Sequence, residues 1–261
     1  MLRLQNINYT YPEGTKGLQD VSLEINKGSK VAFLGENGAG KSSLFLVLNG
    51  IHKAQKGKYF LEENRFKFTS NERKQMAAKV GYVFQDPDVQ LFAGTVFEDV
   101  AFGPSNLGLK GEELEQRVNK YINLLGIGEL REKAPHQLSY GQKKQVAVAG
   151  VLAMEPEIVL FDEPFAWLDN RHKQIMTGII DDLNKQGKTV LISTHNPDFA
   201  YEWADDVVLM KEGRVIACDT PEKVMTNKVM MQEIGMELPL VVRLAKRMGL
   251  NDVPRSIGSL V

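Results

Sequence analysis

The sequence predicts an α/β fold with a mainly parallel central sheet. Short apolar runs alternate along the chain with segments of helical periodicity, and this alternation is typical of strand–helix–strand units. Four apolar runs have the length and composition of buried strands: KVAFLG, KVGYVFQD, EIVLFDEP and KTVLIST, starting at Lys30, Lys79, Glu157 and Lys188.

Other elements follow from local patterns. The stretch from Leu18 to Ile25 alternates apolar and polar residues, which predicts a half-buried strand and an antiparallel subdomain beside the main sheet. Residues 204–218 predict a closing hairpin around Glu212-Gly213, and Thr220 with Pro221 predicts the capped start of a further helix. Helical periodicity ending at or near a glycine marks residues 41–49, 112–125 and 171–186.

Length and composition limit the class of protein. The 261 residues suffice for one large domain, or for one domain with a small appendage. The formal charge of −1 offers no basic field for nucleic acid, so we expect no nucleic-acid partner. The single cysteine, Cys218, excludes an internal disulfide and fits a reducing compartment. The start has no apolar signal region, and no apolar run is long enough for a bilayer. If the protein serves a membrane, we expect the spanning part to be another chain.

A phosphate-binding loop is predicted at GENGAGKS, Gly35 to Ser42. It fits the pattern G-x-x-x-x-G-K-S, and it lies between a predicted strand and a predicted helix. Glycines let backbone N–H groups surround phosphate oxygens, and the helix N-terminus adds positive potential. Lys41 can reach the β- and γ-phosphates, and Ser42 can bind Mg²⁺. A glycine-rich turn without a ligand would leave Lys41 and Ser42 unexplained.

Polar side chains follow three of the predicted buried strands. Asp162 and Glu163 end one strand, Gln85 follows another, and His195 follows the last. In an open α/β sheet this edge is where ligands bind, so all four side chains can converge on a γ-phosphate. Asp162 is predicted to hold Mg²⁺ through water, and Glu163 to polarise the attacking water. Taken singly, a glutamine such as Gln85 is more often an ordinary polar strand end, and a lone histidine such as His195 is most often a surface residue or a satisfied hydrogen-bonding residue.

The stretch LSYGQKKQVAVAG, from Leu138 to Gly150, predicts a helix with a capping box between Ser139 and Gln142. An ordinary capped helix is one interpretation of this polar, glycine-containing start. A ligand-binding helix N-terminus is the other, although the segment lies far along the chain from the phosphate loop.

With these motifs in order, nearly the whole chain resembles the ATP-binding cassette family of ATPases. The resemblance implies a P-loop NTPase core with a mainly parallel sheet, an antiparallel β subdomain, a helical signature subdomain and a C-terminal helical appendage. It implies a cassette domain over residues 1–218, a helical subdomain at about 88–155 and an appendage over 219–261. LSYGQ looks like the family's signature motif, and WLD, Trp167 to Asp169, lies where its D-loop belongs.

The resemblance also implies site roles, with ATP and Mg²⁺ as cofactors. Catalytic roles fall on Lys41, Gln85, Glu163 and His195, and metal ligation falls on Ser42, Gln85 and Asp162. Tyr11 is similar to the aromatic residue that stacks on adenine. The nucleotide contacts implied are Tyr11, Gly35, Glu36, Asn37, Gly38, Ala39, Gly40, Lys41, Ser42, Ser43, Ser139, Gly141 and Gln142.

In this family two cassettes pair head to tail, so that Ser139 and the Gly141 amide would contact the partner subunit's ATP. The segments from Val83 to Leu109 and from Gln142 to Glu157 are most similar to the ATPases of energy-coupling-factor importers, within them to the cobalt and nickel type. This implies a second ATPase subunit, a transmembrane coupling protein and a substrate-binding membrane protein as partners. It places the chain at the cytoplasmic face of the cell membrane.

The alternative functions are a vitamin importer, a soluble non-transport member of the superfamily, and a small-molecule kinase or GTPase. The kinase or GTPase alternative leaves the signature and His195 without a role. Tyr140, Gln145 and Trp167 depart from the usual family residues. The tail from Gly235 to Leu250 either packs on its own domain or adds dimer contacts.

We also predict a docking groove for the membrane coupling protein between Asp86 and Phe102. Apolar side chains in this segment lie amid polar ones, and some of them fit a core role equally well. The apolar residues concerned are Val89, Leu91, Phe92 and Phe97.

Overall fold

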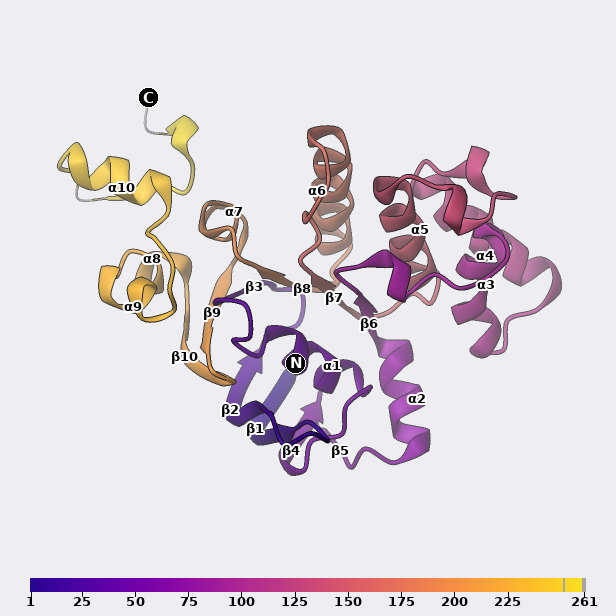
Figure 1. Cartoon of the computed structure of the whole chain (residues 1–261), viewed down its shortest axis with the longest axis horizontal. Coiled ribbons are helices and arrows are strands. Elements are labelled where there is room, and N and C mark those ends of the chain that lie inside the picture. Colours follow the sequence, from indigo (N-terminus) through magenta and orange to yellow (C-terminus); the bar gives the residue numbers. More distant parts are fainter. Residues whose placement is uncertain (251, 260–261) are drawn as a thin grey trace.

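Two β-sheets form the centre of the structure, a computed structural model that describes residues 1–250 and 252–259. The larger sheet has six strands in the order β10-β9-β3-β8-β7-β6 (Figure 1). Its pairs are parallel except for the hairpin of β9 and β10, which confirms the predicted sheet. The bounds are β3 Lys30–Leu34, β6 Val80–Val83, β7 Ile158–Asp162, β8 Thr189–Thr194, β9 Asp206–Lys211 and β10 Arg214–Asp219.

The second sheet is antiparallel, in the order β2-β1-β4-β5, and confirms the predicted antiparallel subdomain. Along β2 the apolar residues Val21, Leu23 and Ile25 are buried and the residues between them are exposed, as the alternating pattern requires. The bounds are β1 Leu2–Thr10, β2 Lys16–Ile25, β4 Lys56–Leu61 and β5 Asn64–Phe66.

Helices cover the larger sheet and extend beyond it at both ends of the long axis (Figure 1). Helices α3, α4 and α5 lie at one end, and α8, α9 and α10 lie at the other. The α-helices are α1 Lys41–Asn49, α2 Ser70–Lys79, α3 Val96–Asn106, α4 Gly111–Leu124, α5 Tyr140–Leu152, α6 Asn170–Lys185, α7 Pro197–Trp203, α8 Pro221–Val224, α9 Lys228–Glu233 and α10 Leu240–Arg247. Short 3₁₀ turns are η1 Pro87–Val89, η2 Gly128–Leu130, η3 Pro135–Gln137 and η4 Ile257–Ser259.

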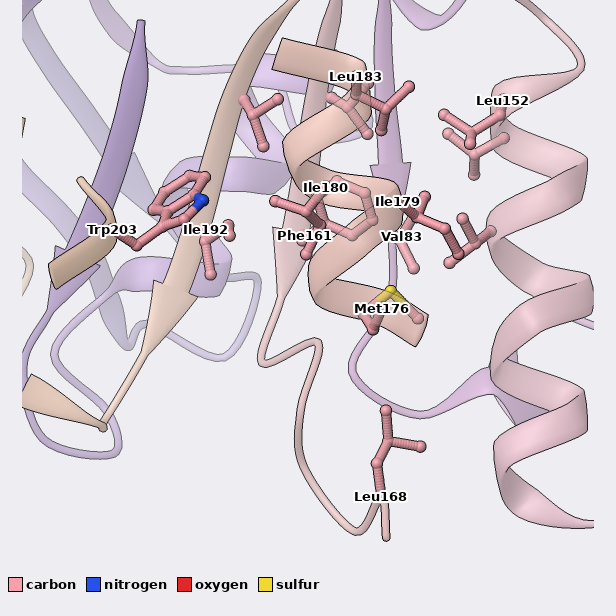
Figure 2. Close-up of a cluster of buried hydrophobic side chains, with 14 of the residues drawn as sticks. Val83, Leu152, Phe161, Leu168, Met176, Ile179, Ile180, Leu183, Ile192 and Trp203 are labelled. Atoms are coloured by element: carbon pink, nitrogen blue, oxygen red, sulfur yellow. The ribbon is translucent and has the colours of Figure 1, made fainter. Parts of the chain in front are cut away.

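Strands β3, β6, β7, β8 and β9 of the larger sheet are buried on both faces, which explains why they are continuous apolar runs. On β3, Ala32 and Leu34 join one hydrophobic cluster, and Val31 and Phe33 join the other. Figure 2 shows part of the first cluster, where side chains of α6 point toward the strands. Met176, Ile179, Ile180 and Leu183 of α6 pack there with Phe161 of β7 and Ile192 of β8. The sheet edge that carries the polar strand ends is therefore held by two packed layers.

The predicted appendage begins after β10. Thr220 is the N-cap residue of α8, as expected, but its side chain makes no capping hydrogen bond. Helix α10 buries Val241, Val242 and Ala245, and the two valines join the same cluster as α6, so this face of the tail packs on its own chain. The boundary between cassette and appendage stays a prediction, and residues 251, 260 and 261 of the appendage lie outside the described residues.

None of the helices within residues 1–250 and 252–259 combines the length and apolar character needed to cross a bilayer.

Candidate active site

The phosphate loop, Gly35–Ser42, connects β3 to α1 as the motif predicts. Gly40 is the N-cap of α1 at φ +101°, a backbone conformation that residues other than glycine rarely adopt. The Lys41 ammonium donates to the carbonyl oxygens of Gly35 and Glu36 at 2.6 and 3.1 Å. Burial lowers the pKa of Lys41, and the carboxylates of Glu163 and Asp162 oppose that shift. The ammonium is thus held over the loop in which a phosphate would bind.

The hairpin turn between β9 and β10 supports the phosphate loop from behind. Glu212 and Gly213 have φ of +49° and +74°, which confirms the predicted turn. The Gly213 N–H donates to the Ala39 carbonyl at 2.9 Å, and a Cβ atom on Gly213 would lie 2.7 Å from the Gly17 carbonyl oxygen. A Cβ on Gly40 would lie 2.8 Å from that same oxygen. Three backbone segments therefore meet where only glycines fit.

Asp162 ends strand β7 and Glu163 follows it directly, as predicted, and Ser193 of β8 connects them. The Ser193 hydroxyl donates to Asp162, and it accepts a hydrogen bond from the Glu163 N–H at 3.0 Å. The Tyr82 hydroxyl donates to the other Asp162 oxygen at 2.8 Å. Burial, and then the Asp162 carboxylate, raise the pKa of Tyr82 far above its usual value, so this hydroxyl stays a donor. The sequence reading missed Ser193 and Tyr82, although each is a polar residue inside an apolar strand.

Glu163 is a buried carboxylate in a strained position. Its φ of +43° lies in the left-handed region, which is rare for a residue with a side chain. Nδ1 of His195 lies 2.9 Å from Oε2 of Glu163, and the His195 side chain is 69% exposed. The imidazole thus contacts the carboxylate on one side and faces solvent on the other.

A cavity of about 300 Å³ brings most of the predicted residues together. Tyr11 lies at this cavity with its hydroxyl 2.8 Å from the Ser43 hydroxyl. An adjoining hollow adds Glu36, Trp167, His195 and Met236 to the wall around Glu163. The first cavity is lined by Tyr11, Thr15, Lys16, Gly17, Asn37, Gly38, Ala39, Gly40, Lys41, Ser42, Ser43, Gln85, Asp162 and Glu163.

Gln85 lines this cavity, and its backbone is fixed by α5. Its carbonyl accepts hydrogen bonds from the Tyr140 hydroxyl at 3.0 Å and from the Lys144 ammonium at 2.7 Å. Lys144 also donates to the Phe84 carbonyl at 2.8 Å. Burial lowers the pKa of Lys144 to about 8, opposed by Asp162, Asp86 and Glu163. The sequence alone did not identify Lys144.

The signature segment, Leu138–Gln142, forms the predicted capping box. The Ser139 hydroxyl accepts from the Gln142 N–H at 3.3 Å, and the Gln142 side chain accepts from the Ser139 N–H at 3.0 Å. Ser139 and Gln142 line a separate hollow with His172, and neither lines the cavity at the phosphate loop. A Cβ atom at Gly141 would lie 2.5 Å from the His172 ring, which explains the glycine. The signature is therefore not brought to the phosphate loop of its own chain.

Gln145, one of the unusual residues, has a structural partner. Its side-chain amide is buried and donates to the Leu125 carbonyl at 2.8 Å, at the end of α4. This contact satisfies a terminal helix carbonyl, for which a glutamine amide suffices.

The predicted docking segment borders a groove of about 630 Å³ between α2, α3 and α5. Phe92 is 65% exposed and meets the Phe102 ring edge-on at 4.7 Å. Phe97 instead packs against the core beneath the Arg131 guanidinium, so the core interpretation holds for this residue. Val89, 71% exposed, lies outside the groove lining.

The residues around the cavity have the chemistry of a site for a nucleoside triphosphate with Mg²⁺. Backbone N–H groups of the loop and the α1 N-terminus suit phosphate oxygens. Ser42 is exposed and offers a hydroxyl, and Asp162 offers a carboxylate whose position is fixed by Ser193. Oxygen ligands of this kind suit a Mg²⁺ ion that is also bound by phosphate.

The comparisons with known proteins agree with this geometry. The family model described as ABC transporter matches residues 18–166. The energy-coupling factor transporter ATP-binding protein EcfA of Carboxydothermus hydrogenoformans is 47% identical, over 93% of this chain and 89% of that protein.

Two solved structures are similar as well. CbiO1 from Clostridium perfringens, described as part of the ABC transporter complex CbiONQ, matches with a TM-score of 0.75 and 37% identity over 94% of this chain and 98% of that one. The ATP-binding cassette MJ0796, solved as a dimer bound to ADP and Pi, matches with a TM-score of 0.78 and 27% identity over 85% and 99%.

Proposed function

This chain belongs to the ABC transporter family of ATPases, and we propose that it is the ATP-hydrolysing subunit of an energy-coupling-factor importer. The observation that carries the proposal is the single cavity that joins the phosphate loop, Gln85, Asp162 and Glu163, next to His195. The similarity to EcfA over nearly the full length of both chains supports the type of transporter.

ATP with Mg²⁺ is the nucleotide of this family, and the residues present fit it. Bound Mg²⁺ neutralises phosphate charge, with Ser42, Asp162 and Gln85 proposed to hold it. Tyr11 is proposed to stack on adenine. The phosphate loop is proposed to bind the phosphates through Gly35, Glu36, Asn37, Gly38, Ala39, Gly40, Lys41, Ser42 and Ser43.

Hydrolysis is assigned to Glu163 as the base that orients and deprotonates the attacking water. Its buried backbone is fixed through Ser193, and its carboxylate is held by His195, so little reorganisation is needed at the reacting centre. Gln85 is proposed to contact the metal or this water, and Lys41 to stabilise charge on the phosphates.

The signature segment is proposed to act on a second ATPase subunit in a head-to-tail dimer. Ser139 is exposed, and the α5 N-terminus favours an anion, yet the segment does not line the cavity of its own chain. A partner's nucleotide therefore accounts for Ser139, Gly141 and Gln142 better than the chain's own nucleotide.

Phe92 and Phe102 are proposed to receive an element of the transmembrane coupling protein at the cytoplasmic face of the membrane. The groove is apolar, two aromatic rings are exposed at it, and the nearby Gln90 side chain donates to the Ala147 carbonyl of α5 at 2.8 Å. The Gln90 side chain also accepts a hydrogen bond from the Phe84 N–H at 3.1 Å, so a movement of this groove would reach the residue before Gln85.

The Phe92→Asp variant tests the function and the docking site together. Co-purification with the coupling protein should fall, because a carboxylate would be buried in the apolar contact. ATP binding should stay at the wild-type value. Val229→Asp is the matched control, since Val229 is 73% exposed and lies on α9. If Phe92→Asp and its control retain the partner equally well, the groove is not the docking site.

Cobalt or nickel is the proposed cargo, with a vitamin as the alternative. The proposal rests on the resemblance of the segments around Gln85 and after Gln142 to that importer type. Metal and vitamin accumulation should be measured in cells whose only copy of the gene for this chain carries Lys41→Ala. Loss of vitamin uptake with normal metal uptake would favour the alternative, and loss of neither would count against an importer.

A further inference from the structure

Two residues that depart from the family pattern, Tyr140 and Trp167, contact each other. Their rings meet edge-on, with centroids 5.5 Å apart and planes at 87°. Tyr140 is the first residue of α5, and Trp167 lies two residues before Asp169, the N-cap of α6. Such a contact between aromatic rings contributes beyond simple burial.

Tyr140 also contacts the Gln85 backbone. Its hydroxyl donates to the Gln85 carbonyl at 3.0 Å. Burial, and then the charges of Asp86 and Asp88, raise the pKa of Tyr140 to about 12, so the hydroxyl remains a donor at neutral pH. One side chain thus touches the segment that carries Gln85 and the segment that follows Glu163.

Trp167 is held in a conformation that tryptophan rarely adopts. Its φ is +58°, and the residue is 69% exposed at the hollow that also contains Glu163 and His195. Glu163, four residues earlier, also has a positive φ. Strain of this kind persists only where the surroundings hold the backbone, and the Tyr140 ring is one group in contact with Trp167.

We propose that Tyr140 and Trp167 form a positioning pair that fixes Gln85 and the segment from Glu163 to Asp169 relative to each other. A displacement of the Gln85 segment is then passed to the segment carrying Glu163 through one side chain. The inference rests on the proposed roles of Gln85 and Glu163. Neither Tyr140 nor Trp167 lines the cavity at the phosphate loop, so the pair acts by placement.

The Tyr140→Phe variant removes the hydroxyl and keeps the ring. The Gln85 carbonyl retains Lys144 as a donor, so no acceptor is left unpaired and the melting temperature should change little. Loss of one neutral hydrogen bond corresponds to about a fivefold lower kcat, with KM for ATP unchanged. Tyr121→Phe is the control, because the Tyr121 hydroxyl donates to Glu155 at 3.1 Å, away from the site.

A double-mutant cycle then tests whether the two residues act as a unit. Tyr140→Leu, Trp167→Leu and the double variant are compared for kcat, KM and melting temperature. The double variant should be no slower than the slower single variant, because either change breaks the same link. Additive losses of kcat, or equal kcat for Tyr140→Phe and Tyr121→Phe, would overturn the pair. If Glu163→Gln also keeps wild-type turnover, the assigned roles themselves are wrong.

Discussion

Glu36 of the phosphate loop packs directly against Gly235 of the C-terminal appendage. A Cβ atom at Gly235 would lie 1.9 Å from Oε1 and 2.3 Å from Cδ of Glu36. Met236, the next residue, lines the hollow that contains Glu163 and His195. The tail therefore contacts the phosphate loop and lines the hollow beside Glu163, which the amphipathic pattern of α10 does not indicate.

We predict that Gly235→Ala displaces Glu36 and weakens ATP binding by the phosphate loop. Gly249→Ala is the control, since Gly249 has φ +69° against +70° for Gly235 and no neighbour within 4 Å. Both variants should lose about 1 kcal/mol of unfolding free energy from the left-handed backbone. Only Gly235→Ala should raise the Kd for ATP in a titration. Equal affinities for the two variants would show that the contact has no bearing on nucleotide binding.

Replacing Glu163 with Gln should slow ATP hydrolysis by at least about a hundredfold while ATP still binds. Glutamine keeps the shape but cannot accept the proton of the attacking water. The measurements are single-turnover hydrolysis and the lifetime of the ATP-bound dimer, which should lengthen. Glu24→Gln, at an exposed position on β2, serves as the control. Wild-type turnover by Glu163→Gln would mean that the base is another residue.

Mixing two inactive variants tests the action of Ser139 on the partner's nucleotide. Lys41→Ala removes the phosphate contact, and Ser139→Arg puts a bulky side chain at the signature helix cap. Each homodimer should be inactive, whereas a mixed dimer has one doubly altered site and one intact site. If subunits exchange at random in an equal mixture of the two variants, the mixed dimers should restore about a quarter of wild-type ATPase activity. ATP-dependent dimerisation of the mixture should be measured as well, because both sites can be required together for turnover. No recovery in either assay would leave the segment as a capped helix only.

The buried Lys144 predicts a specific pH dependence of stability. Its pKa is about 8 in the folded chain and near 10.5 when exposed, so between these values the unfolded chain binds more protons. The cost of burying the charge is present below pH 8 and is relieved as the pH rises. Compared with Lys144→Met, the wild type should gain about 2 kcal/mol of unfolding free energy between pH 7 and 9.5. Denaturant unfolding of both proteins at each pH gives this difference, and a flat difference would contradict the pKa.

The features predicted from sequence are those encoded by neighbouring residues. Each of these features consists of residues that are close together in the sequence. Examples are the strand, glycine loop and helix around Lys41, the acids at the end of β7, and the capping box at Ser139. The missed features join distant parts of the chain. Tyr82 and Asp162 are 80 residues apart, and Lys144 and Gln85 are 59 apart. Their hydrogen bonds depend on packing of the sheet and α5, which no local pattern contains.

The position of β3 determines when the nucleotide site can exist during synthesis. The phosphate loop follows β3, and the two neighbours of that strand, β8 and β9, both come from the last third of the chain. The glycine contact at Gly213 is made later still. A ribosome-bound chain that ends before β8 therefore carries the loop without its flanking strands, so the capacity to hold ATP should be gained late and over a short stretch of elongation.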